Sequence, residues 1–144
     1  MKFNAMFQPI EIGPMTVKNR FVVPPMGNNF ANTDGTMSEQ SAAYYRERAK
    51  GGFGLITIEA TVVHKGAKGG PRKPCLYDDT TIESFRKVID GCHAEGAKVS
   101  IQLQNVGLRE MQRTQEHRSQ QQPAFRLYAD VIFRSSLQLR KFTS

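Results

Sequence analysis

Two kinds of hydrophobic pattern alternate along the first 107 residues of the chain. Short apolar runs that are rich in β-branched residues predict buried strands at 20–23, 55–58 and 98–103. The two stretches between these runs predict helices, and the second has apolar residues at helical spacing: Ile82, Phe85, Val88, Ile89 and Cys92. The order strand, helix, strand, helix, strand requires parallel strands with crossover helices, so we expect an α/β fold.

Capping residues indicate where the two helices begin. The first helix has two candidate N-caps, Thr36 in a capping box with Glu39, and Ser38. For the second helix, Thr80 and Glu83 form a capping-box pattern. Glycines follow both helical stretches and are expected to end them.

A small hairpin is predicted ahead of the first strand. Two short apolar segments, 7–12 and 16–17, flank the turn residues Gly13-Pro14. Parallel units of this kind occur both in doubly wound sheets and in eightfold barrels. No Gly-x-Gly-x-x-Gly motif follows the first strand, which disfavours a dinucleotide-binding unit, but periodicity alone does not choose between the two architectures.

Composition limits the class of protein. The 144 residues are 39% hydrophobic, and no run of about 18 apolar residues occurs, which argues against a membrane-spanning helix. The sequence Met1-Lys2-Phe3-Asn4 does not resemble a secretory signal, so we expect a cytoplasmic protein. Cys75 and Cys92 are too few for a zinc framework or a disulfide scaffold, and we interpret them as buried thiols.

The end of the chain differs in composition from the rest. Of the net charge of +7, residues 1–107 contribute +3 and residues 108–144 contribute +4. All 12 glycines lie between Gly13 and Gly107. We interpret 108–144 as a basic tail that is either a disordered arm or the product of a reading-frame shift, and we favour the frame shift.

The basic tail supports an alternative function, that of a small basic binding protein. Cationic and aromatic side chains mixed in this way are compatible with electrostatic and stacking contacts to nucleic acid. The side chains concerned are Arg126, Arg134, Arg140 and Lys141, together with Phe125, Tyr128, Phe133 and Phe142. The nearly balanced charge of residues 1–107 argues against nucleic acid as a partner of the main part of the chain.

A series of short motifs, all in register, carries a resemblance to one family. The motifs are Pro9-Ile10-Glu11-Ile12-Gly13, Lys18-Asn19-Arg20, Pro24-Pro25-Met26-Gly27, Asp34-Gly35, Tyr44-Tyr45, the run from Arg48 to Leu55, Glu59-Ala60, Tyr77-Asp78-Asp79, Gly96-Ala97-Lys98 and Gln102-Leu103. Over about residues 5–107 the chain resembles the N-terminal part of an NADH:flavin oxidoreductase of the old yellow enzyme family. The stretch Pro24-Pro25-Met26-Gly27 is similar to the 2,4-dienoyl-CoA reductase and 2-enoate reductase branch.

The resemblance implies a fold, a cofactor and a reaction. The fold would be the N-terminal portion of a TIM (β/α)8 barrel, with the hairpin and about three βα units present. FMN would lie at the carboxyl ends of the strands. The full-length family member would transfer hydride from NAD(P)H through FMN to the activated C=C bond of an enoate, an enone or an enoyl thioester.

The resemblance also implies which residues contact the flavin. Pro25, Met26 and Gly27 would lie against it through their backbone. Ala60 would leave room beside the ring, and Gln102 would hydrogen-bond the pyrimidine edge, because an amide offers both a donor and an acceptor. No catalytic residue and no metal ligand is expected in this chain.

Much of the family's machinery is expected elsewhere. A TIM barrel needs about 250 residues, and only three of its strands are predicted here. The substrate-anchoring residues, the phosphate loops, and any FAD or iron–sulfur cluster would come later. A His-Ala-Gly-Arg-like signature is expected after the third strand, where this chain has Asn105-Val106-Gly107-Leu108-Arg109. We therefore expect an inactive fragment with two unpaired sheet edges that binds FMN weakly or not at all, unless a separately encoded remainder of the barrel pairs with it.

The remaining charged and titratable side chains have no expected role. His64, His93 and His117 match no catalytic position and are predicted to lie at the surface. Arg72 and Lys73 lie in a long charged loop and are predicted to be solvated.

Overall fold

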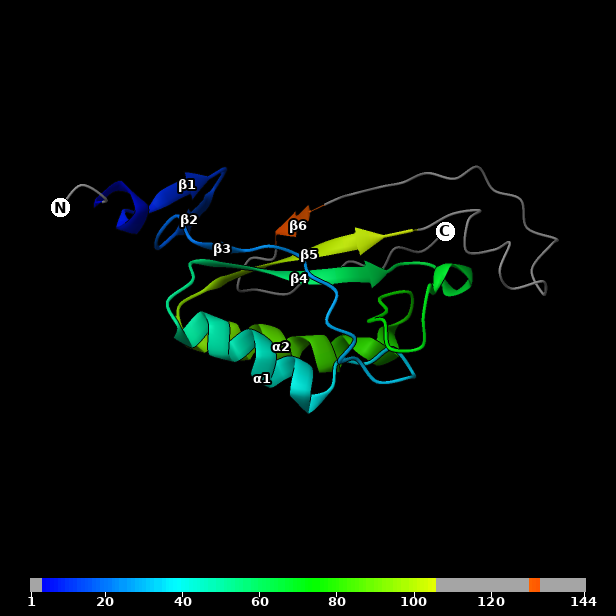
Figure 1. Cartoon of the computed structure of the whole chain (residues 1–144). Helices are drawn as coiled ribbons and strands as arrows, with labels where there is room; N and C mark the ends of the chain where they lie inside the picture. The colour runs from blue at the N-terminus through cyan, green and yellow to red at the C-terminus, as the bar shows by residue number, and fades with distance from the viewer. Residues whose placement is uncertain (1–3, 106–129, 133–144) are drawn as a thin grey trace.

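A mostly parallel sheet with two helices on one of its faces forms the main part of the structure, a computed structural model that describes residues 4–105 and 130–132 (Figure 1). The strands are β3 (Val22–Val23), β4 (Leu55–Val62), β5 (Lys98–Gln104) and β6 (Asp130–Ile132), in that order across the sheet. β3, β4 and β5 run parallel, with Val22 opposite Leu55 and Leu55 opposite Lys98. This arrangement confirms the predicted strand, helix, strand, helix, strand order.

One of the two sheet edges that the sequence predicted to be unpaired is covered. β6 pairs antiparallel with β5, with Ser100 opposite Ile132 and Gln102 opposite Asp130. Apart from β6, residues 108–144 lie outside the described residues, and so do all of the basic and aromatic side chains named for the nucleic-acid alternative.

The predicted hairpin is present ahead of the sheet. A short 3-10 helix, η1 (Asn4–Phe7), precedes β1 (Ile10–Ile12) and β2 (Met15–Val17), which pair antiparallel. Gly13 forms the turn in a left-handed conformation, with φ of 56°, which glycine adopts without steric cost. Figure 1 shows the hairpin beside the amino ends of β4 and β5, opposite the edge where the flavin is expected.

Helix α1 (Glu39–Lys50) begins at one of the two predicted caps. The N-cap is Ser38, whose hydroxyl accepts a hydrogen bond from the backbone N–H of Ser41. Thr36 is therefore not the cap, because its hydroxyl instead donates to the carboxylate of Asp34 at 2.7 Å. The chain leaves the helix through Gly52, whose φ is 99°.

Helix α2 (Ile82–Ala94) does not begin at the predicted capping box. A 3-10 turn, η3 (Asp79–Thr81), precedes it, and the Asp78 carboxylate accepts from the N–H of Thr80 at 2.9 Å. The predicted capping box of Thr80 with Glu83 is therefore wrong. Asp78 instead caps the 3-10 turn η3, and this turn leads into α2.

The hydrophobic core lies between the two helices and the sheet. It contains Val23, Met37, Tyr45, Ala49, Ile56, Ile58, Phe85, Val88, Ile89, Cys92, Ala97, Val99 and Ile101. A smaller buried cluster under the loop after β4 contains Cys75. Both thiols are free and fully buried, as predicted.

Side chains at the amino ends of the strands fasten hairpin, helices and sheet together. The Asn19 amide donates to the Gly52 carbonyl at 2.7 Å and accepts from the N–H of Phe21 at 3.1 Å. A Cβ at Gly54 would lie 2.6 Å from the Asn19 amide oxygen, so this close approach needs glycine. Lys18 donates to the Glu95 carbonyl just beyond the end of α2, at 2.9 Å. Within the described ranges, no helix is long and apolar enough to cross a membrane.

Candidate functional site

The carboxyl ends of the parallel strands bring the predicted site residues to one edge of the sheet. Pro25, Met26 and Gly27 lie in the loop just after β3, Ala60 lies near the end of β4, and Gln102 lies near the end of β5. Catalytic and binding residues of βα proteins lie at this edge, in the loops that follow the carboxyl ends of the strands.

A β-bulge places Ala60 beside Gln102. Ile58 pairs with Ile101 and Thr61 pairs with Leu103, so Glu59 and Ala60 together face the single residue Gln102. Sequence patterning predicted that this strand ends at residue 58, whereas β4 continues through the bulge to Val62. Bulges are frequent next to active sites, because the extra residue redirects side chains and interrupts the ladder.

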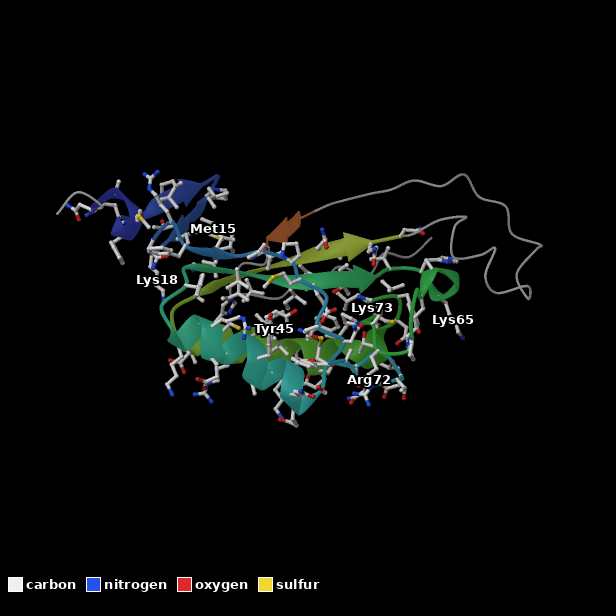
Figure 2. All side chains as sticks on the ribbon, viewed as in Figure 1. Met15, Lys18, Tyr45, Lys65, Arg72 and Lys73 are labelled. Atoms are coloured by element: carbon white, nitrogen blue, oxygen red, sulfur yellow. The ribbon has the colours of Figure 1, made fainter. Side chains whose placement is uncertain are left out.

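The bulge is held by Tyr45, which lies between α1 and the sheet (Figure 2). Its hydroxyl accepts a hydrogen bond from the backbone N–H of Glu59 at 3.0 Å, in a fully buried position. Burial and the neighbouring Glu59 carboxyl raise the pKa of Tyr45, so the phenol stays neutral. Sequence reasoning did not identify Tyr45 as a site-supporting residue, because its partner is a backbone group on another element.

The stretch from Pro25 to Gly27 is open to solvent on one side. Pro25 is half-buried, while Met26 is 49% exposed despite its apolar side chain. The next turn is tied back to the sheet, since the N–H of Asn28 donates to the Glu59 carboxylate at 3.3 Å. Asn29 has a left-handed φ of 58°, and among the described residues it is the only non-glycine with a positive φ.

A buried ion pair lies beneath this stretch. The Glu59 side chain is only 1% exposed, and its carboxylate lies 3.8 Å from the ammonium of Lys73, which comes from the loop after β4. Burial raises the pKa of Glu59, while Lys73 and the N–H of Asn28 lower it. The prediction that Lys73 is solvated is wrong, because its side chain is 24% exposed and faces this carboxylate. Arg72 is exposed, as predicted.

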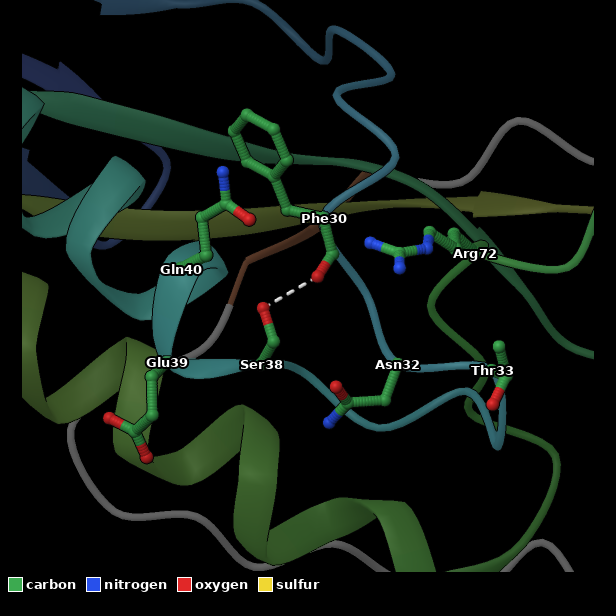
Figure 3. A pocket seen from close by; sticks show the side chains of 7 residues that line it. All are labelled: Phe30, Asn32, Thr33, Ser38, Glu39, Gln40 and Arg72. Atoms are coloured by element: carbon green, nitrogen blue, oxygen red, sulfur yellow. Dashed lines mark hydrogen bonds between the residues drawn. The ribbon is translucent and has the colours of Figure 1, made fainter.

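A separate hollow of about 460 Å³ opens beside the start of α1 (Figure 3). The Ser38 hydroxyl donates to the Phe30 carbonyl at 2.5 Å across its floor. Its lining consists of Phe30, Asn32, Thr33, Ser38, Glu39, Gln40 and Arg72. None of the predicted flavin contacts lines it.

Two of the three histidines can be placed. His64 is exposed, as predicted, and its Nδ1 accepts from the N–H of Gly66 at 3.2 Å. His93 was predicted to lie at the surface, but it is half-buried, and its Nε2 is buried without a hydrogen-bond partner in the described part of the chain. His117 lies outside that part. No group of three metal-ligating side chains occurs within residues 4–105 and 130–132.

The residues at the strand ends offer the kinds of contact that the isoalloxazine ring of a flavin would need. Gln102 is half-buried, and its amide forms no side-chain hydrogen bond with another described residue, so a donor and an acceptor are available for a ligand. Ala60 beside it is small, and the Pro25–Gly27 backbone flanks the same edge. A small side chain next to an amide suits a planar heteroaromatic ring, which needs space together with a few polar groups.

Comparison with known proteins gives consistent matches. The family model for the NADH:flavin oxidoreductase / NADH oxidase family matches residues 5–143. The chain is 36% identical over 106 residues to an NADH oxidase from Thermoanaerobacter brockii, covering 73% of this chain and 16% of that protein. It is 35% identical over 107 residues to a cinnamate reductase from Clostridium sporogenes, covering 71% and 16%. It is also 35% identical over 103 residues to an NADPH dehydrogenase from Listeria monocytogenes, covering 71% and 30%.

Solved structures agree in fold. An old yellow enzyme from Pichia sp. matches with a TM-score of 0.68 and 31% identity, over 72% of this chain and 27% of that one. A 2-naphthoyl-CoA reductase matches with a TM-score of 0.70 and 32% identity, over 72% and 16%. The predicted fold class, the N-terminal portion of a TIM barrel, is confirmed. The chain thus spans less than a third of the length of each of these proteins.

Proposed function

Because this chain belongs to the NADH:flavin oxidoreductase / NADH oxidase family, we propose that its first 107 residues form the flavin-contacting part of an FMN-dependent oxidoreductase. The observation that carries the proposal is the bulge in β4, which sets Ala60 opposite Gln102 at the same sheet edge as Pro25–Gly27. Three segments that are distant in sequence thereby present one small side chain, one amide without a side-chain hydrogen bond to another described residue, and one proline-stiffened backbone stretch.

Each segment has a distinct task in this proposal. Pro24 and Pro25 each fix their own backbone angle φ, which lowers the entropic cost of ordering the stretch against the ring. Gln102 orients the ring through its amide, and Ala60 leaves space for it. The Tyr45 hydroxyl and the Glu59 carboxylate hold the bulge and the loop after β3 in place. When bound, FMN supplies the redox chemistry.

The whole protein's reaction is proposed to be hydride transfer from NAD(P)H through FMN to an activated C=C bond. A cinnamate reductase among the relatives supports an enoate as the substrate class, as does the Pro24-Pro25-Met26-Gly27 stretch. Enones and enoyl thioesters are the other members of this class of activated alkenes. In this proposal the substrate anchor, the phosphate loops, and any FAD or iron–sulfur cluster belong to other segments of the whole protein.

The short span limits what the chain does alone. In TIM-barrel enzymes the phosphate of a ligand is commonly held by loops after strands seven and eight, which supply much of the affinity. The 144-residue chain is therefore expected to bind FMN only weakly in titrations, to lose it during gel filtration and to reduce no enone.

The proposal is tested by titrating FMN with the full chain and following the quenching of flavin fluorescence. Gln102→Ala should weaken binding about tenfold, because one or two hydrogen bonds to the ring are lost. Gln104→Ala is the matched control, since Gln104 is also half-buried on β5 but lies two residues further along the strand. Equal affinities of the two variants, or no binding by the unmodified chain, would contradict the proposal.

A further inference from the structure

Lys73 occupies space that a side chain at position 27 would take. A Cβ built on Gly27 would lie 2.9 Å from the Lys73 ammonium and 3.7 Å from the Glu59 carboxylate. The ammonium thus sits directly beside the backbone stretch that faces the candidate flavin site. Glycine at position 27 admits it there.

The backbone around Lys73 is fixed to the end of β4. The N–H of Val62 donates to the Pro74 carbonyl at 2.9 Å, and the N–H of Leu76 donates to the Val62 carbonyl at 2.8 Å. Pro74 and Cys75 are both buried. The lysine therefore emerges from an anchored segment, so its position is set by the strand end and not by a freely moving loop.

The ammonium has unused donor capacity. Its distance of 3.8 Å from Glu59 is longer than a hydrogen bond, and none of its three donors bonds to a described residue at ordinary length. The buried Glu59 carboxylate nevertheless attracts it and keeps it at this place. The Lys73 side chain is 24% exposed, so it is only partly enclosed by the protein.

We propose that Lys73 is a ligand-contacting residue of the candidate flavin site: its ammonium fills the space beside Gly27 and donates a hydrogen bond to an acceptor oxygen of the bound flavin ring. This inference rests on the proposed function, because it needs a flavin at the Pro25–Gly27 stretch. Glu59 holds the ammonium in place from below.

Lys68 provides a matched control. It belongs to the same loop after β4 and also reaches the loop after β3, since its ammonium donates to the Thr33 carbonyl at 2.6 Å. Thr33 is not among the residues expected to contact flavin. Lys68→Met therefore removes another cationic contact of the same loop without changing the surroundings of Gly27.

The experiment measures the dissociation constant for FMN with the full chain and four variants. Lys73→Met should weaken FMN binding about tenfold or more, Lys73→Arg by no more than about threefold, and Lys68→Met hardly at all. The double variant Glu59→Gln with Lys73→Met removes the buried charge together with its partner, and it should bind FMN as weakly as Lys73→Met alone.

Three results would overturn the inference. Recovery of affinity in the double variant would mean that Lys73 serves only to compensate Glu59, and unchanged affinity of Lys73→Met would mean that it does not contact the ligand. A Lys73-dependent shift of the Gly27 amide resonance on addition of inorganic phosphate alone would indicate a general anion contact. If the unmodified chain does not bind FMN, the proposed function itself fails, and that outcome is distinguished by the unmodified chain's own titration.

Discussion

The hydroxyl of Tyr45 offers a direct test of how the site is built. It is the acceptor for the backbone N–H of Glu59, at 3.0 Å, and both residues are only 1% exposed. Tyr45→Phe keeps the ring in the core but leaves this N–H without an acceptor in a region that water does not reach. An unsatisfied buried donor costs about 1–3 kcal/mol, so we expect the free energy of unfolding to fall by about 2 kcal/mol. The Asn28 amide, 3.5 Å from the same hydroxyl, adds little.

Tyr44→Phe is the matched control for this change. Tyr44 is the adjacent residue on α1 and is half-buried, but its hydroxyl forms no hydrogen bond with the described residues. Its ring contacts, including the Arg48 guanidinium at 3.3 Å from the ring centroid, survive in phenylalanine. The loss of this hydroxyl should therefore change stability by less than about 0.5 kcal/mol.

Urea denaturation of the full chain measures both changes, with equal m-values as the condition for comparing midpoints. Amide hydrogen exchange supplies a second readout, because Tyr45→Phe should accelerate exchange at Glu59, whereas Tyr44→Phe should not. Equal stability of the two variants would refute the view that α1 holds the bulge through this hydroxyl.

Three further predictions concern glycine, histidine and the buried ion pair. Gly54→Ala should destabilise the chain by about 1–3 kcal/mol in urea denaturation, because the new Cβ at the amino end of β4 collides with the side chains of Asn19 and Val17. Gly91→Ala is the control: it lies inside α2, where a Cβ would have only an ordinary contact at 3.8 Å, so it should be neutral or stabilising. Burial, and to a lesser degree the Lys98 cation, lower the pKa of His93, so the unfolded chain binds a proton at this imidazole more readily than the folded chain. Stability should therefore fall as the pH falls below about 6.5, and His93→Gln should remove this pH dependence in thermal melts at several pH values. Burial raises the pKa of Glu59 above its usual value, so ionising this carboxyl costs stability as the pH rises. Lys73→Met should therefore destabilise the folded chain by about 3 kcal/mol at neutral pH and by much less near pH 4, and an equal loss of stability at both pH values would contradict the ion pair.

Local patterns in the sequence were sufficient to predict most elements of the fold. The hairpin around Gly13, the three parallel strands and both helices follow from periodicity and turn residues, which act over a few residues. The start of α2 was missed because Asp78 competes with Thr80 for the cap, and propensity does not rank two good caps.

The supporting contacts of the site depend on tertiary structure and were not predictable in the same way. A glutamate that follows an apolar run is typical of the end of a strand. Only the pairing of β4 with β5 reveals that Glu59 lies in a bulge inside β4. The partners of Glu59 are Asn28 and Lys73, from the loops after β3 and β4. A lysine in a charged loop is ordinarily solvated, and only the fold shows that this one faces a buried carboxylate.

The central claim is that the carboxyl ends of β3, β4 and β5 form the flavin-contacting surface. The most direct test is a titration of the ¹⁵N-labelled full chain with FMN, followed through backbone amide shifts. We predict that the shifts concentrate at Gly27, Ala60 and Gln102, while Leu55 and Lys98, at the amino ends of β4 and β5, stay unchanged. Shifts that are absent, or that are as large at the amino ends as at the carboxyl ends, would contradict the claim.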